Sequence, residues 1–470
     1  MATNITFSRK NLPETQNFLP QNIISLLLLL GDILGLLVSL SIFRWLKGGE
    51  NLNGFDPSMY LFAVLLMTGL YLADTYHPEK QISGLRAPAR ILISNVVAGC
   101  MIAALIYLTG PGNTGLLLQR GTLLLSLALF TIWAMGSRIW AAKWTRAQAQ
   151  NSRWLILGAD QKAILFGQNF LEQKSLGSLV VLTNPGENIN DLLKNHRVST
   201  GTVSDLPQWS QQPWSGVIVA TELSDAQIQH LIHLRLSGIS IYRIPDICET
   251  LWYKLPSSFL DRNWLAFGNG FNLAADGISQ RIKRLTDIIL AWLLLVFLFP
   301  LMLVVAIAIK LNSPGPVFYT QMRTGREGKP FRVYKFRSMY QDAEKRGAQW
   351  AGKQDPRITK VGRWLRLTRI DELPQIVNVL RGEMSLIGPR PERPEFDLKL
   401  REEIPYYDLR YLVKPGITGW AQVMYPYGSS VEDAYEKLAY DLYYIKNYSL
   451  ALDLAIFFKT IRVVILGKGR

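Results

Sequence analysis

The chain has 470 residues, of which 49% are hydrophobic, and a formal net charge of +15. This length allows two or three domains, and a basic excess suits nucleic acid, an anionic membrane face or phosphorylated substrates. A mean hydropathy of +0.12 favours the membrane, and the sequence contains no zinc-finger, aromatic RNA-binding or basic low-complexity motif, so we expect no nucleic-acid partner. The two cysteines are too few for a disulfide framework.

Four apolar segments in the first third of the chain reach the length needed to span a membrane. They are Ile23–Leu46, Met59–Tyr76, Ile91–Leu108 and Leu116–Ile139. Basic residues precede the first segment, separate the second from the third, and follow the fourth, where Arg138, Lys143 and Arg146 stand. The positive-inside rule therefore directs both ends of the bundle to the cytoplasm. We predict that residues 1–150 form a polar tail and four transmembrane helices that serve as an anchor.

Residues 151–277 have the alternating pattern of a soluble α/β domain. Short apolar strands are expected at 153–158, 179–183, 216–221 and 239–244, with helices at 163–173 and 225–236. The pattern is Rossmann-like and similar to CoA-binding domains, but only Gly158 is present where the dinucleotide fingerprint needs three glycines. The second strand ends in Asn184 rather than in an acid that would bind a ribose. A structural or regulatory role is therefore favoured over nucleotide binding.

The third region, residues 278–470, begins with a 22-residue apolar run, Ile288–Ile309. Basic residues flank this run on both sides, and Pro300 lies in its middle, where it removes a backbone donor and kinks a helix. Two arrangements remain open: a helix that crosses the membrane, or a re-entrant hairpin over residues 285–310 that returns to the cytoplasmic side. The flanking charge favours the re-entrant arrangement. Tyr435–Leu466 predicts one or two further helices, either interfacial and amphipathic or part of the core.

Asp371 and Glu372 are adjacent acids in a basic stretch of this third region. Arg363, Arg366 and Arg369 precede them, and no histidine lies beyond residue 279 to act as a base. Two interpretations are open. The acids start a helix and balance surface arginines, or they bind a metal ion and attack a phosphate, because a carboxylate can be a nucleophile towards phosphorus and arginine and Mg²⁺ neutralise phosphate oxygens. Adjacent residues diverge by about 100° on a helix, so the two acids need not share one role.

Four blocks of sequence in this region resemble a known family. The blocks are Lys335–Met339, Asp371–Gln375, Met384–Glu392 and Lys414–Gln422, in the order found in bacterial sugar transferases, the monotopic polyprenyl-phosphate phosphoglycosyl transferases. The resemblance covers residues 279–470, and the preceding regions are similar in architecture to the long form of the family. It implies a mixed membrane protein that has a transmembrane four-helix bundle, a Rossmann-like domain, and a small α+β catalytic domain with a re-entrant helix and interfacial amphipathic helices.

The resemblance also implies a reaction. A phosphosugar passes from a UDP-sugar, with UDP-glucose or UDP-galactose as the usual donors, to polyprenyl (undecaprenyl) phosphate, and UMP is released. This is the initiating step of exopolysaccharide, capsule or O-antigen synthesis at the cytoplasmic face of the bacterial inner membrane. Inner-membrane lipid is a further expected partner, and a homodimer is one hypothesis for the assembly.

The family's site residues carry over to positions in the four blocks. Asp371 is expected to be the nucleophile, to form a covalent phosphosugar intermediate and to bind Mg²⁺, with Mn²⁺ as an alternative. Glu372 is expected to assist. Lys335, Arg337 and Arg366 are expected to contact the substrate phosphates, and Arg390 the nucleotide or its phosphates, each with a structural charge as the alternative reading. Pro300 is the expected membrane break, although the family often has Ser-Pro where this chain has Phe299-Pro300.

Two other functions fit the sequence less well. A membrane-bound nucleotide-sugar dehydratase needs a Tyr-x-x-x-Lys pair, and neither Tyr242 nor Tyr253 has a lysine four residues later. A scaffold for polysaccharide export with an inactive transferase domain is disfavoured by the undamaged blocks and the intact acid pair.

Overall fold

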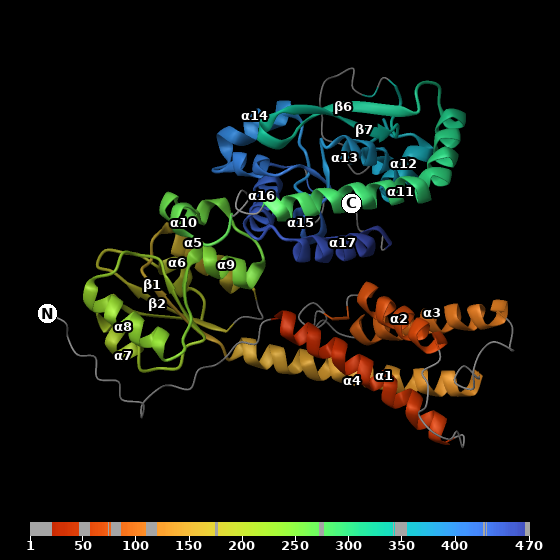
Figure 1. Cartoon of the computed structure of the whole chain (residues 1–470). Coiled ribbons are helices and arrows are strands. Elements are labelled where there is room, and N and C mark those ends of the chain that lie inside the picture. Colours follow the sequence, from red (N-terminus) through yellow and green to blue (C-terminus); the bar gives the residue numbers. More distant parts are fainter. Residues whose placement is uncertain are drawn as a thin grey trace. The chain divides into compact units, whose positions relative to one another are not determined.

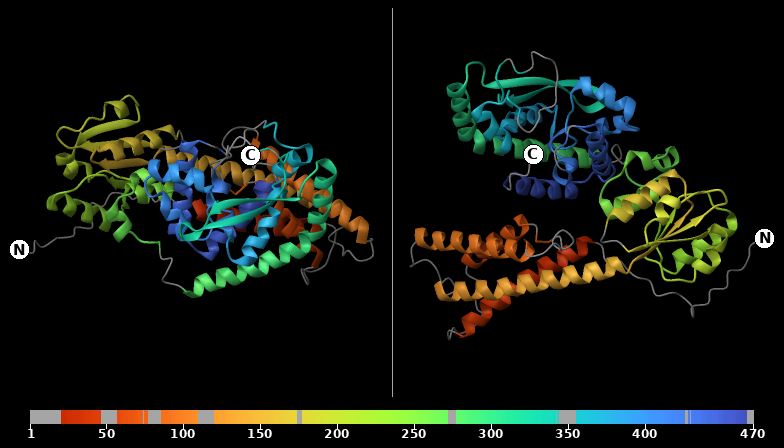
Figure 2. Two further views of the ribbon diagram at one scale, coloured as in Figure 1. Left: turned by 90° about the horizontal axis from the view of Figure 1, so that it is seen from above. Right: turned by 180° about the vertical axis from the view of Figure 1, so that it is seen from behind.

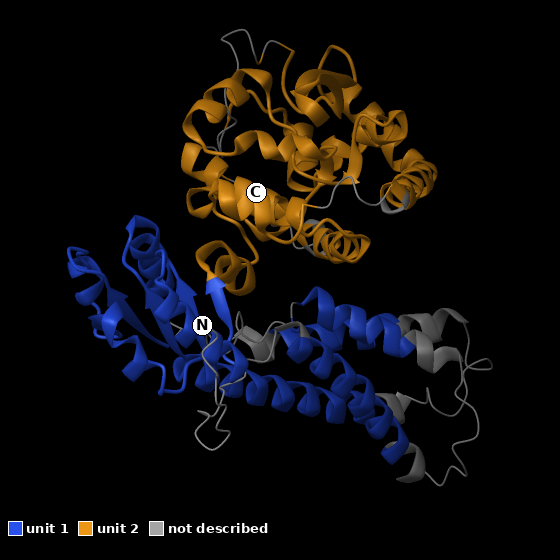
Figure 3. Cartoon of the chain, turned by 60° about the vertical axis from the view of Figure 1, so that its left-hand side comes forward, with its two compact units in different colours: residues 1–242 blue, residues 243–470 orange. Residues whose placement is uncertain are grey.

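The computed structural model describes residues 21–46, 57–73, 75–76, 86–109, 120–173, 177–271, 277–341, 343, 355–425, 428 and 430–465. The chain divides into two compact units, Met1–Tyr242 and Arg243–Arg470 (Figure 3). Each unit is described by itself below.

Four long helices begin the first unit, and they coincide with the four expected apolar segments (Figure 1). They are α1 (Gln21–Leu46), α2 (Pro57–Leu72), α3 (Arg86–Thr109) and α4 (Arg120–Gln150). Within the described residues of this unit, α1 and α4 contain stretches long and apolar enough to cross a membrane, Ile23–Ile42 and Leu124–Gln150, whereas α2 and α3 contain shorter ones. Helix α4 runs eleven residues past the expected end at Ile139, and residues 116–119 of that segment lie outside the described residues.

A buried ion pair joins the first and last of these helices. The guanidinium of Arg138 on α4 donates to both carboxylate oxygens of Asp32 on α1, and the two side chains are 2% and 0% exposed. Tyr76 Oη donates to Asp32 Oδ2 at 2.8 Å, and the Arg138 guanidinium lies 4.9 Å from the centre of the Tyr76 ring. Arg138, predicted from the sequence to be a cytoplasmic flanking charge, is therefore a buried structural residue.

We expect Asp32→Asn to destabilise the first unit strongly. The substitution leaves the buried Arg138 guanidinium without its counter-charge, and breaking a buried pair in this way costs about 3–5 kcal/mol. Thermal unfolding of the full chain in detergent measures the change in Tm. The matched control is Asp191→Asn, because Asp191 forms only an exposed pair with Lys194. Equal Tm values for the two variants would show that the buried pair contributes nothing.

A five-stranded sheet of order β3-β2-β1-β4-β5 completes the first unit. Its strands are β1 (Arg153–Leu157), β2 (Ser178–Thr183), β3 (Val198–Thr202), β4 (Gly216–Val219) and β5 (Ile241–Arg243), with helices α5 (Gln161–Glu172), α6 (Asn190–Leu193), α7 (Leu206–Trp209) and α8 (Asp225–Leu236). The pairs β1–β2, β1–β4 and β2–β3 are parallel, as expected for a Rossmann-like domain. Strand β3 was missed because Val-Ser-Thr-Gly-Thr is a polar edge strand with no apolar run.

The carboxyl edge of this sheet holds an internal carboxylate where a dinucleotide would place its phosphates. The backbone N–H groups of Ala159 and Asn184 donate to Glu187 Oε2 at 2.8 and 2.7 Å. Asp160 accepts from Ala163 N at 2.7 Å and so caps the start of α5. Two carboxylates at this edge repel an anionic ligand. A structural or regulatory role for the domain stays a prediction.

The second unit contains small sheets among many helices, as Figures 1 and 2 show. Its elements are α9 (Ile244–Trp252), α10 (Arg262–Phe267), α11 (Gly277–Asn312), β6 (Phe318–Thr324), β7 (Pro330–Phe336), α12 (Lys360–Leu367), α13 (Ile376–Arg381), β8 (Ser385–Ile387), α14 (Pro394–Glu403), β9 (Gly416–Thr418), α15 (Trp420–Met424), α16 (Val431–Lys446) and α17 (Leu450–Ile465), with short 3-10 helices η5 (Ser257–Phe259), η6 (Arg326–Gly328), η7 (Ile370–Gln375) and η8 (Tyr407–Leu412). Strands β6 and β7 form an antiparallel hairpin, and β8 pairs with β9 in parallel.

Residues 243–271 belong to this second unit by their contacts, whereas the sequence pattern predicts a domain that ends at residue 277. Leu255 N donates to Ala439 O at 2.8 Å, and Trp420 Nε1 donates to Tyr253 O at 2.9 Å. The predicted helical region 435–466 forms two helices: α16 buries Leu438 and Leu442 in the core, whereas α17 exposes Leu454. Helix α16 therefore fits the core reading, and the interfacial reading stays a prediction for α17.

Helix α11 is 36 residues long and continues through Pro300. It bends along its length (Figures 1 and 2). Near its start, Arg284 donates to the carbonyls of Val379 and Leu380 at 2.6 and 2.9 Å, and at its end Asn312 Oδ1 accepts from Val361 N at 3.3 Å. Both ends of the helix therefore contact the same unit. Most of its apolar run Ile288–Ile309 is not buried, and the buried side chains within this run are Ala291, Val305 and Ile309.

Candidate active site

The acid pair lies in η7, between α12 and α13. Asp371 and Glu372 occupy its first turn and are 8% and 6% exposed. Arg369 precedes them with a left-handed backbone (φ 55°), and its carbonyl accepts from Glu372 N at 3.2 Å. The pair does start a helix, as one interpretation predicted. The same interpretation had the acids balance surface arginines, and their burial excludes that role because they are not surface groups.

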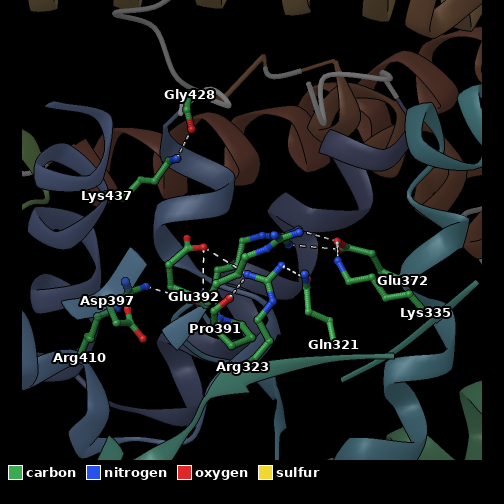
Figure 4. Close-up of polar contacts among 12 residues, drawn as sticks. Gln321, Arg323, Lys335, Glu372, Pro391, Glu392, Asp397, Arg410, Gly428 and Lys437 are labelled. Carbon is green, nitrogen blue, oxygen red and sulfur yellow. Dashed lines mark hydrogen bonds and ion pairs between the residues drawn. The ribbon is translucent and has the colours of Figure 1, made fainter. Parts of the chain in front are cut away.

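Glu372 is surrounded by cations. Arg390 donates to both of its oxygens, at 2.5 Å to Oε1 and 3.2 Å to Oε2, and Lys335 Nζ lies 3.0 Å from Oε1 (Figure 4). Arg369 Nη1 adds a longer contact of 3.6 Å. Burial alone would raise the pKa of Glu372, but Arg390 and Lys335 outweigh it and hold the pKa well below its usual range. Glu372 is therefore an ionised, fully engaged anchor for the surrounding cations.

Asp371 has the opposite environment. Within the described part of the chain, its carboxylate makes no hydrogen bond or ion pair, and its nearest cations act on it only through space. Burial and the neighbouring Glu372 charge raise the pKa of Asp371 to about 6, against the lowering effect of Lys335, Arg366 and Arg390. A desolvated carboxylate without a fixed partner is available to react or to bind a ligand.

Cations outnumber acids around the pair. Arg323 forms an ion pair with Glu392 at 3.2 Å, and its charge acts on Lys335, whose pKa is lowered by burial first and then by Arg390 and Arg323, against Glu372. The cations of the cluster are Arg323, Lys335, Arg366, Arg369 and Arg390, and its acids are Asp371, Glu372 and Glu392. The surplus of positive charge suits a ligand with two phosphate charges.

The predicted phosphate contacts separate into two groups. Lys335 and Arg390 bind Glu372, and Arg366, which donates to Ser338 Oγ at 2.8 Å, acts on the Asp371 charge. Arg337 instead donates to the carbonyls of Ser313 and Pro314, both at 2.7 Å, and so holds the chain just after α11. Its observed contacts fit the structural alternative left open for each basic residue.

Sequence reasoning missed the residues that fix the Arg390 loop. Arg410 donates to the Arg390 carbonyl at 2.8 Å and forms an ion pair with the buried Asp441 at 3.1 Å. Arg323 donates to the Pro391 carbonyl at 3.2 Å from the other side (Figure 4). Arg410 and Asp441 come from η8 and α16, so no local motif could have indicated their proximity. They act as positioning residues for Arg390.

Few side chains around the pair could serve as ligands of a metal ion. No group of three or more His, Cys, Asp or Glu side chains that could hold a metal occurs among the described residues. Both Glu372 oxygens are engaged, so Asp371 is the carboxylate that remains available. Mg²⁺ commonly binds through one or two carboxylates together with substrate phosphates, and this arrangement fits that mode.

Comparison with known proteins gives consistent matches to this region. Residues 278–467 match the family model described as bacterial sugar transferase. The chain is 35% identical over 329 residues to the UDP-glucose:undecaprenyl-phosphate glucose-1-phosphate transferase of Escherichia coli K12. This alignment covers 68% of this chain and 69% of that protein. It is also 47% identical over 239 residues to the UDP-N-acetylgalactosamine-undecaprenyl-phosphate N-acetylgalactosaminephosphotransferase of Aeromonas hydrophila, covering 51% of this chain.

The extent of these matches differs between relatives. A UDP-glucose:undecaprenyl-phosphate glucose-1-phosphate transferase of Klebsiella pneumoniae is 45% identical over 224 residues, or 47% of this chain. The chain spans about half the length of the Aeromonas and Klebsiella relatives, 55% and 48%. The E. coli alignment is longer than the residues 278–467 matched to the family, so it also includes residues before 278.

Proposed function

We infer that this chain, which belongs to the bacterial sugar transferase family, transfers a sugar phosphate from a UDP-sugar to undecaprenyl phosphate and releases UMP. The observation that carries the proposal is the division within the acid pair, with Glu372 engaged by Arg390 and Lys335 and Asp371 left available in a basic surrounding. The named relatives use glucose and N-acetylgalactosamine donors. N-acetylgalactosamine therefore joins glucose and galactose as a candidate sugar for this chain, and the reaction would initiate exopolysaccharide, capsule or O-antigen synthesis.

The proposed chemistry has two displacements at one phosphorus atom. The Asp371 carboxylate attacks the phosphorus that carries the sugar, the bond from that phosphorus to the bridging oxygen breaks, and UMP leaves with that oxygen. An oxygen of undecaprenyl phosphate then attacks the same phosphorus, which releases the carboxylate and forms undecaprenyl diphosphate sugar. Arg390, Lys335 and Arg366 would neutralise phosphate charge during both steps.

A divalent cation, Mg²⁺ or Mn²⁺, belongs to the proposal because the available donors fit one. Asp371 would hold it together with phosphate oxygens of the donor, and Glu372 is committed to Arg390 and Lys335. When bound, the ion would supply additional neutralisation of the diphosphate charge.

We propose that α11 is re-entrant and that the second unit lies on the cytoplasmic face of the inner membrane. Contacts from both ends of α11 to the same unit support this arrangement, because a straight helix of 36 residues would separate its ends by about 54 Å. Exposed apolar side chains on α11 and α17, such as Phe297 and Leu454, would face lipid. A homodimer remains a hypothesis.

Cysteine labelling tests the proposed topology. Ser279→Cys and Lys310→Cys flank the apolar run of α11, and both should react with a membrane-impermeant thiol reagent only in inside-out vesicles. The background is a chain in which Cys100 and Cys248 are replaced by serine. Labelling of the two positions from opposite sides would show a spanning helix instead.

A turnover assay tests the proposed function. Purified chain is incubated with undecaprenyl phosphate, Mg²⁺ and UDP-glucose, UDP-N-acetylgalactosamine or UDP-galactose in turn. UMP and a lipid-linked sugar diphosphate should form with at least one donor, and without acceptor a phosphosugar should remain on Asp371, detectable by rapid quench and mass spectrometry. Failure of every sugar nucleotide to release UMP would favour the scaffold reading.

We expect the first displacement to slow as the pH falls through about 6. The pKa of Asp371 is raised to about 6, and only its ionised form attacks, so the reactive fraction falls about tenfold between pH 7.5 and pH 5. The measurement is the burst of UMP release in the absence of acceptor. The acceptor is left out because its lipid phosphate also titrates at about pH 6 and would overlap the titration of Asp371. A burst rate that stays constant over this range would contradict the raised pKa.

A further inference from the structure

A second group of cations lies at the far end of α13 from the acid pair. Gly382 follows α13 with a left-handed backbone (φ 85°), and the space where its side chain would stand is called the notch below. Arg284 Nη2 lies 3.3 Å, and Lys414 Nζ 3.7 Å, from the place that a Cβ on Gly382 would occupy. Two cations, one from α11 and one from the chain before β9, therefore lie beside this one glycine.

The charges around this notch are not balanced within the described residues. Arg284 is held in place by the carbonyls of Val379 and Leu380, whereas the Lys414 ammonium makes no hydrogen bond or ion pair with another described residue. Burial, and then the charges of Arg284 and Arg326, lower the pKa of Lys414, and only Asp287 acts in the opposite direction. Asp287 Oδ1 already accepts from Leu386 N at 3.1 Å. An anion in the notch would offset this repulsion.

The notch is separate from the acid pair. Asp371 and Glu372 precede α13 and Gly382 follows it, and a six-residue helix is about 9 Å long. The cations that bind Glu372 directly are Lys335, Arg369 and Arg390, none of which lines the notch. Any anion held by Arg284 and Lys414 is therefore additional to the donor phosphates in the proposed reaction.

The position of the notch indicates the kind of anion. Arg284 directly precedes Leu285, which is 58% exposed, and Ile289 further along α11 is 48% exposed. A charged group at the start of an interfacial apolar helix lies at the depth of lipid headgroups. Helices α11 and α13 pack closely (Figure 1), so the notch is fixed to the helix that would carry it to the membrane.

We propose that Gly382, Arg284 and Lys414 form a second anion-binding site, which takes the phosphate group of a membrane lipid. The proposal rests on the membrane placement argued under the proposed function. Two sources share this chemistry, an anionic phospholipid headgroup and the phosphate of a polyprenyl phosphate. In either case the site would hold a lipid phosphate beside α11 without contact to the reacting carboxylate.

Amine labelling tests the site in the full chain. Lys414 is acetylated in maltoside micelles, which contain no phosphate, and then with phosphatidylglycerol, undecaprenyl phosphate or inorganic phosphate added at equal concentration. Mass spectrometry gives the rate at Lys414 relative to Lys399, an exposed lysine on α14 that is 69% exposed. We expect either lipid to slow labelling of Lys414 several-fold and to leave Lys399 unchanged, and the more effective lipid identifies the source. Equal labelling in all micelles, or equal protection by inorganic phosphate, overturns the proposal.

A substitution gives an independent measurement. The Lys414→Gln variant should retain the protective lipid roughly tenfold less well in native mass spectrometry, because it loses one charge-assisted contact. The matched Lys399→Gln variant should retain the lipid fully. Equal retention by both variants argues against the site. UMP release by the unmodified chain is measured in the same preparations, so that failure of the lipid site is distinguished from failure of the proposed transferase activity.

Discussion

Asp371→Asn should reduce UMP release by on the order of 10³-fold or more, with the chain still folded. The amide of asparagine cannot attack phosphorus. Among the described residues, Asp371 is the acid of the pair whose carboxylate is not held by an ion pair, so the substitution removes the available carboxylate. Rapid-quench assays with each UDP-sugar measure the loss, and the variant should give no covalent phosphosugar. The control is Asp408→Asn, because Asp408 is 69% exposed and pairs only with Arg401.

The same substitution should leave stability unchanged or increase it at neutral pH. The folded-state pKa of Asp371, about 6, lies above the ordinary value of 3.8. Folding therefore favours the protonated form, and the ionised carboxylate destabilises the native state once the pH rises above this window. Asparagine removes that destabilisation, so the Tm of the variant should match or exceed that of the parent chain at pH 7.5 and converge with it near pH 4. A lower Tm at pH 7.5 would assign Asp371 a structural role.

The apolar segments were predictable because hydropathy is a local property. The four N-terminal segments and the run around Pro300 all coincide with helices. The pairing of Asp32 with Arg138 was not predictable, because it joins residues 106 positions apart and the positive-inside rule treats Arg138 as a loop charge. Strand β3 was missed for a different reason: it is an edge strand whose stability comes from its ladder to β2 rather than from apolar burial.

The site shows a similar division between local and distant information. The motif blocks indicated Asp371 and Glu372, and the helical divergence of neighbours indicated separate roles. The roles themselves depend on partners elsewhere in the chain, since Lys335 is 37 and Arg390 18 positions from Glu372. Lys335 and Arg337 stand two residues apart, but β7 ends at Phe336, so strand alternation no longer fixes the direction of Arg337.

Glu372→Gln is expected to give the opposite stability result from Asp371→Asn. The substitution removes the negative charge between Arg390, Lys335 and Arg369, and loss of one partner from a buried charged cluster costs about 3–5 kcal/mol. The cations should separate, and Arg390 should leave the position in which Arg410 holds its backbone. UMP release should therefore fall together with Tm. The control is Glu403→Gln, whose partner Lys399 is exposed and 3.6 Å away.

The pH dependence of this second variant separates the two acids. The pKa of Glu372 is held well below the ordinary value of 4.5, so its contribution to stability is complete above that value and is lost as the pH falls through the folded-state pKa. The Tm difference between Glu372→Gln and the parent chain should therefore be largest near pH 7 and shrink in acid. For Asp371→Asn any difference has the opposite sign at pH 7.5. Stability changes of the same sign for the two variants would contradict the division of the pair into a reactive acid and an anchoring acid.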